Sequence, residues 1–224
     1  MKMFKRLSVF LLVVLAGVYG YRQIWTIVHE KEILRQVIGR LQADSRVAEV
    51  LVTGVNYDEQ QKKKITTIKY LEYDIDGKPM LPKYFSFSGN IIQFQSLVIR
   101  FDDNLIKKND PLRGRSAYLF WKVFLLDGAK TQEYEITPMY QIPQGYKVQG
   151  LNDSFEESLW KEFWSFALDP QKAGQQGIKS AQIEAPGTMF IPGVLYTIKI
   201  EHDGGLRIDS SALSPILRGE KILR

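Results

Sequence analysis

An uncharged run over residues 7–21 constrains this chain more than any other stretch of its sequence. As a helix the run would be about 22 Å long, which is shorter than the roughly 30 Å hydrocarbon core of a bilayer. Apolar residues continue past Arg22 to Val28, and the long arginine side chain can reach the lipid headgroups. Because a helix over residues 7–28 would be about 33 Å long, the sequence predicts one membrane-spanning segment that contacts the lipid bilayer.

The two ends of this segment predict its orientation. Three basic residues lie within the first six positions, before the apolar run, and Tyr19, Tyr21 and Trp25 lie near its other end. Basic residues stay on the cytoplasmic side of a membrane, and tyrosine and tryptophan gather at the interface. We therefore expect a single-pass membrane protein with a cytoplasmic N-terminus and a body, from residue 29 onward, that is periplasmic or extracellular.

A cleaved signal peptide is the alternative for this segment, because a basic start followed by an apolar run also marks proteins for export. Val18 and Gly20 are acceptable at the two positions that a signal peptidase reads, but the sequence has no Ala-x-Ala-like site. Apolar helical character also continues beyond such a cut. These two observations favour an uncleaved anchor.

Residues 22–45 have the pattern of a helix, which we interpret as a stalk. Apolar residues recur there at intervals of three and four, and a heptad assignment places charged residues in either core register. A short coiled coil is the first interpretation. The alternative is that the stripe packs on the chain's own domain or lies along the membrane. The residues predicted to form the oligomerisation seam are Ile27, Leu34, Val37, Ile38 and Leu41.

Charge and cysteine content exclude several classes of protein. The chain has no cysteine, which excludes disulfide scaffolds, thiolate metal sites and cysteine nucleophiles. Its net charge of +5 is carried by the first six and the last seven residues, so residues 7–217 are neutral overall. A neutral body lacks the basic face that phosphate binding requires. No nucleic-acid partner is therefore expected.

From residue 46 onward the apolar period changes to two, and turn residues recur at regular intervals. The body is therefore predicted to be mainly β. The predicted strands are residues 47–56, 65–73, 84–88, 91–101, 116–126, 131–137, 177–184, 194–202 and 206–208, with a further short one at 146–149. The predicted organisation is a cytoplasmic start and anchor over residues 1–21, the stalk over 22–45, a β-rich exported domain over 46–209 and a basic tail over 210–224.

One helix is predicted inside this body, over residues 155–168. Ser154 and Glu157 have the spacing of a capping box, and Pro170 ends the helix. Its broad apolar face includes Trp160, nearer the edge, and Trp164. The predicted strand 116–126 has bulky residues on both faces and needs two covers. The fold class expected is therefore mainly β, with one N-terminal transmembrane and stalk helix: a β-sandwich or partly open barrel with one intercalated amphipathic helix.

In the predicted strand 116–126, strict alternation of side chains predicts two apolar faces. One face would consist of Tyr118, Phe120, Phe124 and Leu126. The other would consist of Leu119, Trp121, Val123 and Leu125.

Titratable residues give no recognisable catalytic or metal-binding motif. His29 lies on the stalk and His202 at a predicted strand end, next to a turn. Asp74 and Asp76 begin a calcium-loop pattern that lacks its last acidic ligand, so a hairpin turn is preferred. A polar loop containing Asp102, Asp103 and Asp110 is a weaker cation candidate. We expect no metal, no cofactor and no catalytic residue.

Three hypotheses for function follow. The first is a non-enzymatic structural or adaptor component of a cell-envelope assembly, which associates through its stalk or its sheet edges with further copies of itself or with other envelope proteins. The second is an envelope binding module for a glycan, lipid or peptide in an aromatic-lined pocket. The residues predicted to line this pocket are Tyr118, Trp121, Trp160 and Trp164.

The third hypothesis is an envelope hydrolase that uses dispersed carboxylates. Its candidate residues are Glu133, Glu135 and Glu184. No motif in the sequence matches a known arrangement of catalytic carboxylates, so this hypothesis requires two of them to meet in a cleft.

Overall fold

A computed structural model describes residues 14–22, 24–25, 28, 48–60, 62–74, 77–101, 116–127, 130–143, 153–169, 171–172, 178–200 and 205–217. The predicted stalk seam, both histidines, the acidic loop after residue 101, the short strand at 146–149 and Pro170 all lie outside the described residues. The helical residues 14–22, 24–25 and 28 belong to the predicted membrane segment. Within the described part of the chain, no helix has the length and apolar content needed to cross a membrane.

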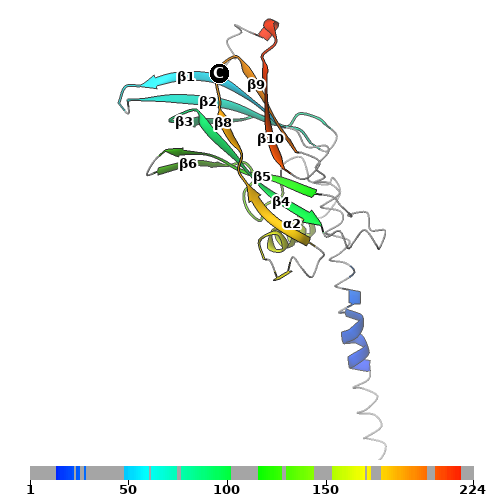
Figure 1. Cartoon of the computed structure of the whole chain (residues 1–224). Helices are drawn as coiled ribbons and strands as arrows, with labels where there is room; N and C mark the ends of the chain where they lie inside the picture. Colours follow the sequence, from blue (N-terminus) through cyan, green and yellow to red (C-terminus); the bar gives the residue numbers. More distant parts are fainter. Residues whose placement is uncertain are drawn as a thin grey trace, which may run out of the picture.

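The body is mainly β and consists of two antiparallel sheets (Figure 1). Sheet I has the strand order β10-β9-β1-β2-β3, and sheet II has the order β6-β5-β4-β7, with β8 also paired to β4. The strands are β1 Ala48–Asp58, β2 Lys63–Glu72, β3 Lys83–Phe87, β4 Ile91–Phe101, β5 Ser116–Asp127, β6 Lys130–Glu135, β7 Ile178–Glu184, β8 Gly187–Met189, β9 Val194–Ile200 and β10 Leu206–Ala212. The mainly β prediction is therefore confirmed.

Most strand positions follow from the alternation of the sequence. The predicted strands that are consecutive in the chain form the antiparallel pairs β1–β2, β5–β6 and β9–β10. Two features differ from the prediction: β8 lies between the predicted strands 177–184 and 194–202, where no strand is predicted, and β10 continues to Ala212 before a short 3-10 helix at Pro215–Leu217. The β-rich body therefore extends beyond residue 209, and the expected tail begins later.

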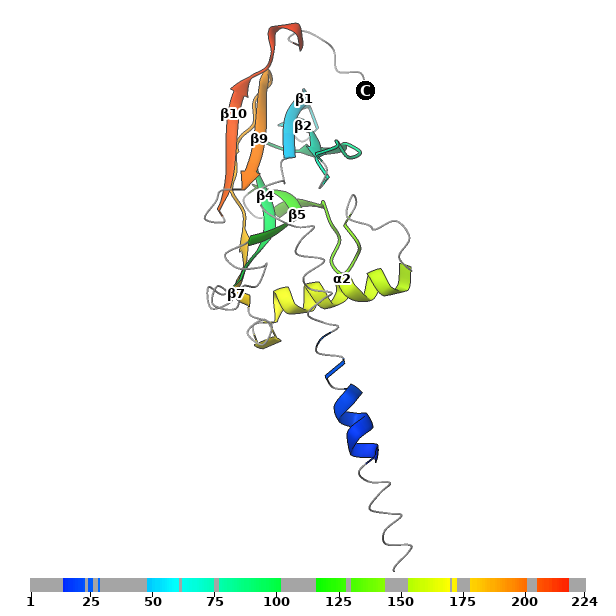
Figure 2. The same ribbon diagram turned by 90° about the vertical axis from the view of Figure 1, so that its right-hand side faces the viewer.

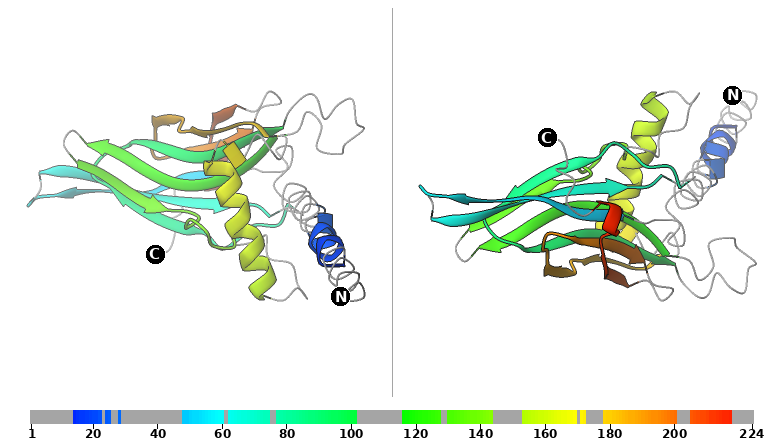
Figure 3. Two further views of the ribbon diagram at one scale, coloured as in Figure 1. Left: turned by 90° about the horizontal axis from the view of Figure 1, so that it is seen from below. Right: turned by 90° about the horizontal axis from the view of Figure 1, so that it is seen from above.

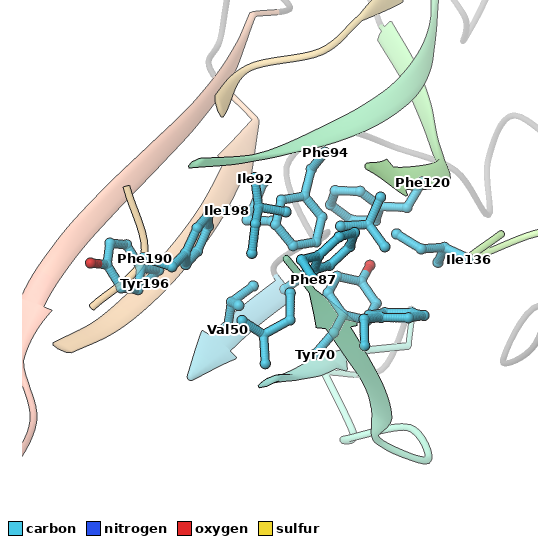
Figure 4. Close-up of a cluster of buried hydrophobic side chains, with 14 of the residues drawn as sticks. Val50, Tyr70, Phe87, Ile92, Phe94, Phe120, Ile136, Phe190, Tyr196 and Ile198 are labelled. Atoms are coloured by element: carbon cyan, nitrogen blue, oxygen red, sulfur yellow. The ribbon is translucent and has the colours of Figure 1, made fainter. Parts of the chain in front are cut away.

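The core lies between the two sheets, as in a β-sandwich (Figure 4). Val50 and Ile68 from sheet I and Phe94 and Phe120 from sheet II are all 1% exposed or less. The rings of Tyr70 and Phe94 stack with centroids 5.6 Å apart, which joins the sheets directly. Burial of many such side chains, each contributing about 1.5 to 3 kcal/mol, stabilises the two layers against each other.

A bulge in β5 corrects the predicted alternation of that strand. Lys122 pairs with Gln95 of β4 and Phe120 pairs with Ser96, so Trp121 is an extra residue with no partner there. Such an insertion changes which face the following side chains occupy. Phe120, Val123 and Leu125 consequently share the sandwich core, and the prediction that Phe120 and Leu125 lie on opposite faces is wrong.

Helix α2 (Asp153–Leu168) crosses the outer face of sheet II (Figures 2 and 3). The sequence predicted the helix two residues shorter at its start and with the same last residue. Trp160 and Trp164 are both 0% exposed, and the rings of Trp121 and Trp164 meet edge to face with centroids 5.6 Å apart. The helix therefore covers β5 from outside the sandwich, as expected, and is not intercalated between the sheets. Trp160 does not lie nearer the edge of the contact.

Candidate interaction surfaces

The predicted aromatic site divides between the two faces of β5. Tyr118 is 1% exposed and lies two residues before the core residue Phe120, so both side chains point toward the sandwich core. Trp121, which is 8% exposed, faces α2 instead, where Trp164 and Trp160 lie. The structure thus brings three of the four predicted residues together and places Tyr118 on the other side of the sheet.

Four buried aromatic residues form the contact between α2 and β5, which we call the Trp cluster: Trp121, Trp160, Phe163 and Trp164. The rings of Trp160 and Phe163 meet edge to face at 5.5 Å between centroids. The buried indole nitrogens of all three tryptophans have no hydrogen-bond acceptor in the described part of the chain. Most buried donors are paired, so the cluster is apolar packing with three donors that, unusually, have no partner among the described residues.

Tyr140 adjoins this cluster, although no pattern in the sequence identifies it as a site residue. Its ring centroid lies 6.4 Å from that of Trp164, and 47% of the residue is exposed. Its backbone has a φ of 62°, which lies in the left-handed region that residues other than glycine rarely adopt. Tyr140 is therefore the exposed edge of an otherwise closed cluster.

The three carboxylates of the hydrolase hypothesis do not meet. Glu133 lies on β6, where Lys122 Nζ approaches its carboxylate at 3.1 Å, and Glu135 is exposed on the same strand. Glu184 lies on β7, at the opposite edge of sheet II, and is 2.9 Å from the guanidinium of Arg100. Two of these carboxylates are thus held in ion pairs, and β6 and β7 are separated by two strands.

The acidic turn after β2 is a hairpin turn, as preferred from the sequence. The carboxylate of Asp74 accepts the backbone N–H of Lys78 at 2.8 Å, and Gly77 has a left-handed φ of 73°. Asp76 lies outside the described residues. Among the residues that the structure does describe, no group of three or more acidic or histidine side chains could hold a metal ion.

One buried polar cluster lies where sheet I meets the segment after β6. Glu72 is 5% exposed and accepts a hydrogen bond of 3.2 Å from the hydroxyl of Tyr70. Lys83 lies opposite Tyr70 on β3, and its ammonium donates to the backbone carbonyl of Ile136. Burial lowers the pKa of Lys83, and the nearby charge of Glu72 partly offsets this shift. The cluster connects β3 of sheet I to the segment that follows β6 of sheet II, so its burial is explained by a structural role.

The outer face of sheet II is apolar again beyond α2, at the end where β4 begins. Ile91, Leu126 and Met189 are strand residues that each adjoin a core residue in the chain, so they point away from the core. They are 54%, 65% and 55% exposed, and Ile91 pairs directly with Met189. We call these three residues the end band.

Polar residues separate the end band from α2. Lys122 and Gln95 form a cross-strand pair between the two apolar regions, and Lys122 also carries the ion pair to Glu133. Its ammonium lies 5.5 Å from the ring centroid of Trp121. The end band is therefore a separate exposed surface, and not the frayed margin of the Trp cluster.

The hairpin β1–β2 projects beyond the sandwich (Figure 3). Near its tip Val55 and Tyr57 are 41% and 62% exposed. β3 pairs with β2 only as far as Thr66, and β9 pairs with β1 only as far as Leu51. The distal part of this hairpin is therefore a two-stranded ribbon, a structure that is marginally stable in water by itself.

Comparison with known proteins adds no family or function. No protein-family model, no curated protein sequence and no solved structure matches this chain. The arrangement of its own residues therefore carries the functional argument.

Proposed function

We propose that this protein is a non-enzymatic, membrane-anchored structural or adaptor component of a cell-envelope assembly. The observation that carries the proposal is the end band, because three large apolar side chains at least half exposed on adjacent strands are typical of a protein-binding surface. A partner that covers Ile91, Leu126 and Met189 would remove this apolar area from water.

The anchor in this proposal rests on the sequence of residues 7–28. The helical residues in this stretch support it, since Val18, Tyr19, Ile24 and Trp25 are all more than half exposed. Residues 14–22 lie apart from both sheets, on the side of the body that α2 covers (Figures 1 and 2). In this proposal the N-terminus is cytoplasmic, and the body is periplasmic or extracellular.

The experiment is copurification of the full chain from native membranes, comparing the natural sequence with Met189→Glu and Leu126→Glu. A charge in the end band should release the partner, because burying an unpaired carboxylate costs several kcal/mol. Ser210→Glu is the matched control, since Ser210 is exposed on β10 of the other sheet. Equal recovery of the same partner with all three variants would contradict the proposal.

A binding module for a glycan, lipid or peptide is the second candidate. It is favoured by the three buried indole N–H groups that have no acceptor within the described residues. A ligand that entered beneath α2 beside Tyr140 would supply acceptors to the Trp cluster. Its test is tryptophan fluorescence of the full chain during titration with envelope glycans and lipids, with Tyr140→Ala as the variant. An unchanged emission spectrum would exclude this function.

A further inference from the structure

Among the strands that the structure describes, only β2 pairs with residues 52–58 of β1. β2 pairs with the whole length of β1, whereas β9 pairs only with residues 48–51. Among the described strands, none pairs with the other side of residues 52–58. A strand edge of this kind presents backbone N–H and C=O groups that another strand can bind. We call residues 52–58 the open edge.

The sheet edges at β3, β6 and β10 are shielded in ways that the open edge is not. Along β3, the hydroxyl of Tyr134 donates to the carbonyl of Ser86 at 2.8 Å, and the side-chain oxygen of Gln132 accepts the N–H of Ser88 at 2.8 Å. β6 and β10 carry charged side chains, which discourage pairing with another chain. The open edge has no charged side chain before Asp58.

Two further features of the open edge indicate that another strand approaches it. Val55 and Tyr57 share one face of β1, and both are exposed. Gly54 has no atom within 4 Å of the position that a Cβ would occupy, and its φ is not in the left-handed region. The bulge beside Gly54 accounts for a glycine at this position, and the open space next to it leaves room for the backbone of another strand.

We propose that the open edge pairs with the open edge of a second copy of this chain, antiparallel about a two-fold axis at Asn56. Val55 of each copy then lies opposite Tyr57 of the other, and a β-branched residue opposite an aromatic one is a favourable cross-strand pair. Gly54 lies opposite Asp58, so no like charges face each other. The four exposed apolar side chains cover one another, which makes the surface self-complementary.

The register with the two-fold axis at Val55 is less suitable for this pairing. It would place Val55 opposite itself and Tyr57 opposite Thr53. Thr53 is the extra residue of a bulge, because Val52 pairs with Ile68 and Gly54 with Thr67. A bulge interrupts the hydrogen-bond ladder, so the axis at Asn56 keeps the paired residues 54–58 within regular strand.

The pairing depends on the membrane anchor of the proposed function. Five residues from each copy bury less than the roughly 1,200 Å² of a stable interface, so the pair is weak between free molecules. Two copies anchored in one membrane have a much higher effective concentration, which converts weak pairing into a populated dimer. The join would place the distal β1–β2 ribbon of one copy edge to edge with the same ribbon of the other, on the side of β1 where β9 pairs with residues 48–51.

A single-cysteine crosslink tests the pairing, because the chain has no cysteine of its own. Asn56→Cys places one thiol of each copy at the axis, where the Cα–Cα distance of about 4.5 to 5.5 Å in an antiparallel pair permits a disulfide. Mild oxidation of the full chain in native membranes should give a covalent dimer. Ser210→Cys, at an exposed position of β10, is the control and should stay monomeric.

Charge substitutions test the register. In the Asn56→Cys background, Val55→Lys should lower the yield of crosslinked dimer about tenfold, because Tyr57 of the second copy then faces a charge. Adding Tyr57→Glu should restore the yield, since each lysine would face a glutamate of the other copy. Both positions are exposed, so these changes leave the core intact.

Several results would overturn the inference. These are a monomer with Asn56→Cys, an equal dimer yield with Ser210→Cys, no rescue by Tyr57→Glu, or a crosslink to a protein of different mass. Fractionation of the same samples tests the anchor independently. Recovery of the natural chain in the soluble fraction would reject the proposed function, and oxidation of the concentrated soluble variants would then decide whether the edges pair.

Discussion

The two ends of the outer face of sheet II differ in one respect, which is whether the chain itself covers their apolar side chains. At one end α2 buries Trp121 beneath Trp164, and at the other the end band is half exposed. Because α2 covers the Trp cluster and no described element covers the end band, we interpret the two apolar regions differently. The first stabilises the fold, and the second binds a partner in the function that we propose.

Truncation in the Trp cluster should have the largest effect on stability. Trp164→Ala should reduce the free energy of unfolding by about 3 to 5 kcal/mol, as large aromatic truncations in cores do. Trp160→Ala should cost a similar amount, because the two residues are equally buried. Chemical denaturation of the full chain in detergent measures both. An unchanged midpoint for either variant would mean that α2 does not stabilise the body.

Gly187→Ala should have an intermediate effect at the boundary of the end band. A Cβ at this position would lie 2.7 Å from Cγ of Gln93 and 3.1 Å from the carbonyl oxygen of Ile92. Overpacking of this kind costs about 1 to 3 kcal/mol. The same denaturation assay measures the loss. Gly54→Ala is the matched control, because a Cβ there meets no atom within 4 Å; an equal loss at both positions would contradict the steric explanation.

Met189→Ser tests the end band, where we expect a small change in stability and a loss of partner binding. Since Met189 is 55% exposed, the change in unfolding free energy should stay within about 0.5 kcal/mol. Copurification of the envelope partner should nevertheless fall. A loss of stability comparable to that of Trp164→Ala would show that the end band belongs to the folded core.

The smallest effect on stability is expected at the outer face of sheet I. This face is polar there, unlike the Trp cluster and the end band. The guanidinium of Arg207, 2.7 Å from the carboxylate of Asp209, lowers the pKa of that carboxyl, and Lys199 adds to the shift. A lowered pKa in the folded state stabilises the fold above the unfolded pKa, and this contribution is lost as the pH falls through the folded value. Asp209→Asn should therefore slightly reduce stability at neutral pH and flatten its loss in acid. Parallel denaturation series from pH 2 to 7, as an approximate range, measure the difference.

Local patterns predicted most elements, whereas features that depend on neighbouring strands were missed. Alternation in the sequence located β4 to the residue, and the breadth of the apolar face identified α2 as the outer cover of β5. β8 has three residues between prolines and shows too little alternation to be recognised. The bulge at Trp121 depends on pairing with β4 and has no local signature.

The candidate surfaces were less predictable than the fold. The predicted site groups Tyr118 with the tryptophans because aromatic residues cluster in binding sites as well as in cores, although alternation along the strand already places Tyr118 and Trp121 on opposite faces. The end band comes from three strands far apart in the chain, so no sequence window contains it. Exposure of Val55 and Tyr57 depends on where β3 and β9 stop. In the last two cases the missing information is long-range pairing, which the alternation of single strands does not contain.

The position of β1 has a mechanical consequence. This strand is the first of the body after the helical N-terminal segment, and it lies in the middle of sheet I, between β9 and β2. Tension between an N-terminal tether and a bound partner would therefore pull along a central strand. Both flanking ladders would be loaded in shear, so many backbone hydrogen bonds would have to break together, and not one after another as when an edge strand peels away. Single-molecule extension from the N-terminus should therefore show high resistance to unfolding.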